Sequence, residues 1–352
     1  MPDDWNSFMD KYKSKIEDTL SEFFEKKKTE VNHPLLREAV EIIEEYTLRG
    51  GKRVRALLMI LGYRMYGGKD DEIIKAAATL ELVQSYFLIH DDIMDESDLR
   101  RGKKTVHKIY EEEHLHRGFP GNPARFGENL GIIAGDLANV YAFEIFAETE
   151  FDSDRKERAL QELERIMEYT GYGQLIDVYS SMLPEFGEKD LLLLHEYKTA
   201  NYTIYGPLAL GAILAGAEPE SLRDFAIPIG IAFQLQDDIL GLFGDEKKIG
   251  KPVTSDLAEG KKTLLIIKAL ENANDEERKE ILEALGNPAV TIEQLMRVRE
   301  IVEHTGSLEY SRSMAEKLVN EGIAALEKIA VPNREYRDIL VGMAEYMIRR
   351  TM

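Results

Sequence analysis

Apolar residues recur along most of this chain at the three- and four-residue spacing that places them on one face of an α-helix. The spacing is plain over residues 5–28, where Trp5, Phe8, Tyr12 and Ile16 are separated mostly by polar and charged residues. The two-residue alternation of a β-strand is almost absent, and there is no Asn-Gly or Asp-Gly hairpin signal. The pattern predicts an all-α protein of roughly ten or more helices, whose first 30 residues form an amphipathic helix.

Proline and glycine mark the ends of the predicted helices without marking a boundary between domains. Pro34 stands where a helix over residues 35–48 would begin, and Gly50-Gly51 stand where it would end. No stretch has the composition of a linker. A single domain over residues 1–352 is therefore predicted.

Residues 110–128 are predicted to be a surface loop inserted in this domain. The segment is polar and holds a cluster of turn-forming residues around Pro120. His107, His114 and His116 lie in or beside it and raise the question of a zinc site. The turn-forming residues favour a surface loop over a His-ligated metal.

Composition narrows the classes of function. The 352 residues carry a formal net charge of −20, so no domain-wide basic surface is available for nucleic acid. The chain has no cysteine, which rules out disulfides, thiol catalysis and Cys-ligated zinc. The N-terminus does not read as a signal peptide, and no run of 18 apolar residues predicts a membrane span. These features fit a cytoplasmic protein.

Two aspartate motifs, each at the end of an apolar run, are the strongest chemical signal. One reads Asp-Asp-Ile-Met-Asp from Asp91 to Asp95, and the other reads Asp-Asp-Ile-Leu-Gly from Asp237 to Gly241. In a helix, Asp91 and Asp95 project from one face. Carboxylates crowded in this way must be solvated, paired with cations or bound to metal. Oxygen ligands without His or Cys beside them favour Mg²⁺, with Mn²⁺ as an alternative.

Basic residues follow the aspartates and also cluster elsewhere. Arg100 and Arg101 come soon after the first motif, and Lys52 and Arg55 follow the Gly50-Gly51 pair at a spacing of three. Arginine and lysine beside Mg²⁺-binding carboxylates are typical of a diphosphate site. On these residues alone, a solvated acidic helix end and a solvated basic turn remain open alternatives.

These motifs resemble those of a known family, the trans-isoprenyl diphosphate synthases. The resemblance covers residues 35–270, and its motifs occur in the family order and at the family spacing. The residues that carry it are Gly50-Gly51-Lys52-Arg53-Val54-Arg55, Asp91 to Asp95 through Arg100-Arg101-Gly102-Lys103, Gly135-Asp136, Lys198-Thr199, Phe233 to Asp238, and Gly250-Lys251-Pro252. Together they are highly specific.

The resemblance implies a single-domain helical bundle around a central cavity, and a head-to-tail condensation of isopentenyl diphosphate with an allylic diphosphate. It implies Mg²⁺ held by Asp91, Asp95 and Asp237. It places the substrate diphosphates on Lys52, Arg55, Gln84, Arg100, Arg101, Lys251 and Lys261. It gives catalytic roles to Asp91, Asp92, Asp95, Lys198, Thr199, Gln234, Asp237 and Asp238. It also implies a homodimer.

Product length should depend on the depth of the cavity below the first motif. Tyr86 and Phe87 lie about one helical turn before Asp91, and in short-chain members of the family aromatic residues at these positions form a floor. The expected product is C15 or C20, farnesyl or geranylgeranyl diphosphate. The chain departs from the family pattern at Gly241, where an aspartate is common, and the role of Asp256 nearby is left open.

Three other functions compete with this interpretation. A class I terpene cyclase shares the aspartate motif but needs only one diphosphate site, which would leave Lys52, Arg55 and Arg101 without a role. A Mg²⁺-dependent diphosphohydrolase would not need two substrates. A catalytically silent subunit of a hetero-oligomeric synthase is disfavoured because both aspartate pairs are present.

Overall fold

The computed structural model describes residues 3–183, 185–244 and 253–348. Within them the chain forms more than ten helices and one short two-stranded ribbon, which confirms the all-α prediction. The helices divide into two compact units. The N-terminal unit holds residues 6–60 and 69–153, and the C-terminal unit holds residues 1–5, 61–68 and 154–352. The single domain expected from the sequence stays a prediction.

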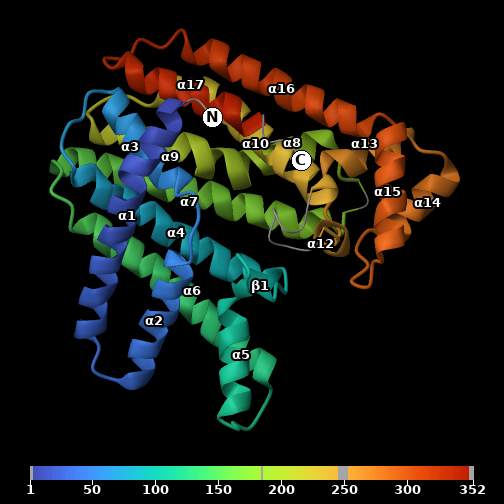
Figure 1. The fold of residues 1–352 in the computed structure, drawn as a ribbon, viewed down its shortest axis with the longest axis horizontal. Helices are drawn as coiled ribbons and strands as arrows, with labels where there is room; N and C mark the ends of the chain where they lie inside the picture. The colour runs from blue at the N-terminus through green and yellow to red at the C-terminus, as the bar shows by residue number, and fades with distance from the viewer. Residues whose placement is uncertain (1–2, 184, 245–252, 349–352) are drawn as a thin grey trace. The chain divides into compact units, whose positions relative to one another are not determined.

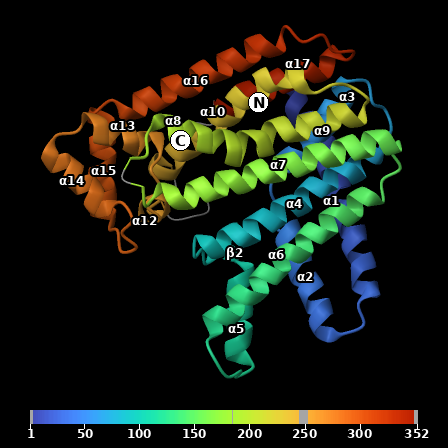
Figure 2. The same ribbon diagram turned by 180° about the vertical axis from the view of Figure 1, so that it is seen from behind.

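The N-terminal unit is built around the paired helices α4 and α6. These two helices run side by side, and α5 packs on α6 (Figures 1 and 2). The elements of this unit are α1 (Asp3–Glu30) after its first residues, α2 (Pro34–Leu48), the first half of α3 (Val54–Met65), α4 (Glu72–Met94), β1 (Leu99–Arg100), β2 (Lys103–Lys104), α5 (Val106–His116) and α6 (Pro123–Ala147).

Local sequence explains where these helices begin. The ring of His33 accepts a hydrogen bond from the amide of Leu35, and Pro34 occupies the first turn of α2, where its missing N–H costs nothing. Along α1 the periodic residues Tyr12 and Ile16 are buried, as their spacing predicted.

The prediction of a surface loop over residues 110–128 was wrong. Most of that segment is helical, because α5 ends at His116 and α6 begins at Pro123, leaving a loop over residues 117–122. The turn-forming residues obscured a helical face, since Tyr110 and His114 are spaced by four and both are buried. In the described parts of the chain, no three His, Cys, Asp or Glu side chains form a group that could hold a metal directly.

The C-terminal unit is organised around α10, which packs against η1 and α16 (Figure 2). Its elements are α7 (Ser153–Ser180), α8 (Glu188–Leu194), the π-helix η1 (His195–Tyr205), α9 (Gly206–Leu214), η2 (Glu220–Leu222), α10 (Arg223–Phe243), α12 (Ser255–Ala258), α13 (Leu264–Asn272), α14 (Asp275–Ala284), α15 (Ile292–His304), α16 (Ser307–Leu326) and α17 (Arg334–Ile348). Ile239 of α10 shares an apolar cluster with Leu257 of α12 and Leu265 of α13. This cluster fixes the segment after residue 253 under the end of α10.

The π-helix η1 is the one irregular stretch in the helical path from α8 to α9. The side chain of Asn201 donates to the carbonyl of Glu196, five residues earlier. A side chain at Gly173 would lie 2.4 Å from the backbone nitrogen of Lys198, and one at Gly230 would lie 2.4 Å from the Cα of Ala200. Helices α7 and α10 therefore approach the π-helix more closely than any residue larger than glycine allows, at positions next to Lys198 and Thr199. Wide helical turns of this kind are frequent at functional sites.

Two helical stretches are long and apolar enough to cross a membrane by composition alone, namely Pro123–Ala147 and Glu220–Phe243. Their most apolar windows are 44% and 61% buried within the protein. Both stretches are thus partly covered by other parts of the protein.

Candidate active site

The first aspartate motif lies at the C-terminal end of α4, with Asp95 as the C-cap residue. Its three carboxylates have different environments. Asp92 is fully buried, and its Oδ2 accepts a hydrogen bond from Tyr46 Oη at 2.6 Å while its Oδ1 accepts one from Arg100 Nε at 2.7 Å. Asp91 and Asp95 are half-buried, and Asp91 Oδ2 lies 3.4 Å from Arg100 Nη2. Asp91 and Asp95 are thus the accessible pair, whereas Asp92 holds Arg100.

The burial of Asp92 has an electrostatic consequence. Burial raises the pKa of the Asp92 carboxyl, and the charge of Arg100 acts in the opposite direction. Burial likewise raises the pKa of Tyr46, as does the Asp92 charge, so the phenol remains a hydrogen-bond donor. Asp92, Tyr46 and Arg100 therefore form a buried network of the kind that fixes a side chain in one orientation.

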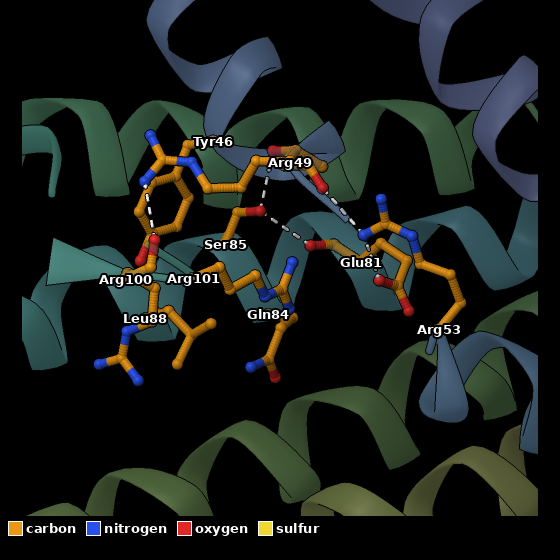
Figure 3. Close-up of a pocket in the computed structure, with 10 residues that line it drawn as sticks. Tyr46, Arg49, Arg53, Glu81, Gln84, Ser85, Leu88, Arg100 and Arg101 are labelled. Carbon is orange, nitrogen blue, oxygen red and sulfur yellow. Dashed lines mark hydrogen bonds and ion pairs between the residues drawn. The ribbon is translucent and has the colours of Figure 1, made fainter. Parts of the chain in front are cut away.

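A basic pocket of about 270 Å³ opens beside this network in the N-terminal unit (Figure 3). Its lining includes four arginines and one amide, Arg49, Arg53, Arg100, Arg101 and Gln84. Arg53 is buried against Glu81, with Nη1 3.1 Å from Oε2. Arg49 pairs with Glu45 and donates to the carbonyl of Lys104. A pocket with this excess of guanidinium groups suits a phosphate or diphosphate.

The glycine pair before this pocket has a structural purpose. Gly50 and Gly51 both have positive φ, at 97° and 118°, a conformation that side chains disfavour. A Cβ on Gly51 would lie 3.0 Å from the guanidinium of Arg101, whose Nη1 donates to the carbonyl of Gly50. The glycines therefore let Arg101 lie directly on the backbone.

The residues predicted from the sequence to bind diphosphate differ in part from those that line this pocket. Gln84, Arg100 and Arg101 line it as expected. Lys52 is exposed and Arg55 is half-buried, and neither is among the lining residues. Arg49 and Arg53 were missed, although Arg53 stands inside the Gly-Gly-Lys-Arg motif. Spacing along a helix gave no signal for them, because Arg53 precedes α3 with a positive φ of 53°.

A second pocket, of about 480 Å³, lies in the C-terminal unit between α7, η1, α10 and the segment after α12. It is lined by Asp177, Ser180, Leu191, Leu194, His195, Lys198, Thr199, Gln234, Asp238, Lys261, Lys262 and Thr263. The predicted residues Lys198, Thr199, Gln234, Asp238 and Lys261 are thus brought together.

Two sets of contacts order this pocket. Lys198 Nζ lies 2.5 Å from Asp177 Oδ2. Thr199 Oγ1 donates to Gln234 Oε1, and Gln234 Nε2 donates to Asp238 Oδ1, each at 2.9 Å. Asp177 thus lies in the pocket wall as the counter-ion of Lys198.

Asp238 has the chemistry of a cation ligand. It is 9% exposed, and its Oδ2 accepts no hydrogen bond within the described residues. The Nε2 atom of His195 lies 3.4 Å from this oxygen. Burial lowers the pKa of His195 to about 4, so at neutral pH the ring is uncharged. Burial raises the pKa of Asp238 to about 7, although the Gln234 hydrogen bond acts to lower it.

These donor sets fit Mg²⁺. A buried carboxylate oxygen without a donor suits a hard cation, and the pocket of the C-terminal unit offers further oxygen atoms from Asp177, Thr199 and Gln234. The described residues provide no three-ligand group, but Mg²⁺ is usually held by one or two carboxylates together with phosphate oxygens and water.

The remaining predicted residues are placed as follows. Asp237 lies half-buried on α10, and Lys251 lies outside the described residues. The rings of Tyr86 and Phe87 are in contact on α4, with centroids 4.8 Å apart, and both side chains are half-buried.

Comparison with known proteins agrees with this chemistry. A family model described as polyprenyl synthetase matches residues 37–302. The geranylgeranyl diphosphate synthase of Sulfolobus acidocaldarius is 35% identical over 86% of this chain and 87% of that protein. The geranylfarnesyl diphosphate synthase of Aeropyrum pernix is 33% identical over 86% of this chain and 91% of that protein.

A solved structure gives the same result. The chain resembles the geranylgeranyl pyrophosphate synthase of Corynebacterium glutamicum, crystallised with isoprenyl diphosphate and magnesium. The TM-score is 0.93 at 32% identity, and the match covers 97% of this chain and 99% of that one. These comparisons confirm the resemblance drawn from the sequence motifs: the chain belongs to the polyprenyl synthetase family.

Proposed function

We propose that this chain is a short-chain trans-prenyltransferase, which joins isopentenyl diphosphate head to tail to an allylic diphosphate of C5 to C15. The observation that carries the proposal is the presence of two separate pockets, each lined by cationic side chains and each adjoining one aspartate motif. Two diphosphate substrates need two such sites. A terpene cyclase or a hydrolase would need only one, and neither alternative is favoured.

In the proposed mechanism, one set of residues binds isopentenyl diphosphate and another promotes ionisation of the allylic diphosphate. Arg101, Arg53 and Gln84 hold isopentenyl diphosphate in the pocket of the N-terminal unit. The family resemblance assigns the allylic diphosphate to Arg100, Lys198 and Lys251, the last of which lies outside the described residues. Their charges stabilise the departing diphosphate more than the bound ester, and this difference lowers the barrier to ionisation.

Asp91, Asp95 and Asp237 would hold Mg²⁺, which supplies further positive charge to the leaving diphosphate. The Thr199 hydroxyl and the Gln234 amide present dipoles to the allylic cation. Attack by the double bond of isopentenyl diphosphate and loss of a proton complete the condensation. Fixing the second substrate beside the cation makes the step effectively unimolecular.

The test is a product assay. Purified protein is incubated with Mg²⁺, labelled isopentenyl diphosphate and, separately, the C5, C10 and C15 allylic diphosphates, and the dephosphorylated products are chromatographed. Prenyl alcohols of C15 or C20 are expected, with turnover lost on chelation by EDTA and regained with Mg²⁺. Hydrocarbons, or inorganic phosphate without chain growth, would refute the proposal.

Product length provides a prediction of its own. Replacing Tyr86 and Phe87 together by alanine removes two half-buried rings one turn before Asp91. If these rings form the floor of the chain cavity, the main product lengthens by at least one C5 unit. The assay above measures it. Phe119→Ala, which changes an exposed ring in the loop over residues 117–122, is the matched control. A double variant with the parent's products would show that the floor lies elsewhere.

A homodimer is the expected oligomeric state, and the cytoplasm is the expected location. One observation supports the homodimer: on helix α6 the exposed fractions of Ile132, Ile133 and Val140 are 42%, 52% and 58%, which gives an apolar stripe that a second copy would cover. Light scattering coupled to size exclusion should give twice the chain mass. Changing Ile133 and Val140 to glutamate should shift the mass towards one chain, and an unshifted dimer would contradict this interface.

A further inference from the structure

The second aspartate motif ends in glycine, and the structure shows what fills the vacated space. Gly241 lies one turn after Asp237 on α10, on the same face of the helix. A Cβ built on Gly241 would lie 2.0 Å from Asp256 Oδ2 and 3.2 Å from Asp256 Cγ. The carboxylate of Asp256 therefore rests directly on the α10 backbone, in the volume that a side chain at position 241 would enter.

Asp256 reaches this position from another element. It belongs to the short helix α12 and is 9% exposed. Leu257, the next residue, is packed in the apolar cluster that includes Ile239 of α10. The backbone carbonyl of Asp256 accepts a hydrogen bond from the amide of Lys261, which lines the pocket. The carboxylate is therefore held against α10 by packing on one side and by the lysine-bearing turn on the other.

Asp256 also lies close enough to Asp238 of α10 for the two carboxylate charges to interact. Like charges this close destabilise one another unless a cation lies between or beside them. The independent sign of a cation is Asp238 Oδ2, which is buried and accepts no hydrogen bond within the described residues.

We infer that Asp256 supplies the third carboxylate of the second aspartate motif, from a different helix, and that Gly241 is the residue that makes room for it. The inference rests on the proposed function and adds to it a specific positioning residue for the divalent cation. Asp256 does not need to touch the cation. A carboxylate beside a Mg²⁺ site commonly acts through a metal-bound water, because Mg²⁺ keeps several waters.

The test measures cation binding directly. Mn²⁺ is titrated into the full-length protein, alone and with inorganic diphosphate, and free Mn²⁺ is followed by electron paramagnetic resonance. Asp256→Asn keeps the shape of the side chain and removes its charge, so it should weaken Mn²⁺ binding about tenfold. Asp224→Asn, an exposed change in the first turn of α10, should bind as the parent does.

Placing a carboxylate on α10 instead of α12 distinguishes a role of Asp256 in cation binding from a role in folding. Asp256→Ala alone should bind Mn²⁺ weakly, and adding Gly241→Asp should restore affinity to within about threefold of the parent, as a compensating pair does. Thermal unfolding of each variant confirms that it is folded. Parent-like binding by Asp256→Asn, or a double variant no better than Asp256→Ala, would overturn the inference.

The same preparations distinguish this inference from the proposed function. A parent protein that elongates prenyl chains and binds Mn²⁺, with Asp256→Asn indistinguishable from it, would refute only the role of Asp256. A parent that neither elongates prenyl chains nor binds Mn²⁺ in the presence of diphosphate would refute the proposed function itself.

Discussion

Asp92→Asn should lower both the stability and the activity of this enzyme. The wild-type carboxylate accepts hydrogen bonds on both oxygens, from Tyr46 and from Arg100, at full burial. An amide offers only one acceptor and no charge, so the guanidinium of Arg100 loses its closest counter-ion and keeps only the more distant Asp91, at 3.4 Å. Removing one partner of a fully buried pair costs about 3–5 kcal/mol. Because the Arg100 side chain is 29% exposed, we expect a loss of about 2–3 kcal/mol in the free energy of unfolding.

The expected kinetic effect is about a hundredfold loss of kcat/KM, since Arg100 is no longer held where the diphosphate binds. Tyr46→Phe is the matched control. It removes one hydrogen bond from Asp92 and should cost about 1–2 kcal/mol of stability, while Arg100 stays in place and activity stays near that of the parent. Urea unfolding and steady-state kinetics measure the two quantities. A fully active Asp92→Asn variant would show that Arg100 does not depend on this contact.

The helical fold could be predicted from the sequence because its signals are local. Three- and four-residue periodicity identified α1, and Pro34 marked the start of α2. The loop predicted over residues 110–128 was wrong over 110–116 and 123–128, where the glycines and prolines between α5 and α6 outweighed the helical signal on either side. The sequence also gave no sign of the π-helix η1, because its wide turns depend on how closely α7 and α10 approach it at Gly173 and Gly230.

The candidate site could be predicted as a set of residue types but not as a set of roles. The motif indicates three aspartates, yet only the tertiary structure separates the buried Asp92 from the accessible Asp91 and Asp95. Arg49 was missed because an arginine that ends α2 looks like a helix cap. Whether a residue faces a pocket depends on how its element packs against elements distant in sequence, and the spacing of residues along the chain does not give that information.

Lys198→Gln carries the largest expected kinetic effect in the C-terminal unit. Its ammonium group lies in the pocket wall 2.5 Å from Asp177, on a backbone that Gly173 allows α7 to approach. If Lys198 stabilises the charge of the departing diphosphate, removing it should lower kcat/KM for the allylic substrate by about 10²–10³-fold. Stability should change little, because the side chain of Lys198 is partly exposed and glutamine can still donate to Asp177.

Two further variants test whether charge or position matters. Asp177→Asn leaves the lysine in place but weakens its anchor, so a smaller loss of about tenfold is expected. Lys189→Gln changes an exposed lysine on α8, close in sequence but outside the pocket, and should leave kcat/KM unaltered. We expect the largest loss for Lys198→Gln, a smaller one for Asp177→Asn and none for Lys189→Gln. This order follows only if the positive charge of Lys198 itself stabilises the departing diphosphate. Equal losses in the first two variants would instead indicate that the salt bridge, rather than the lysine charge, is what the reaction requires.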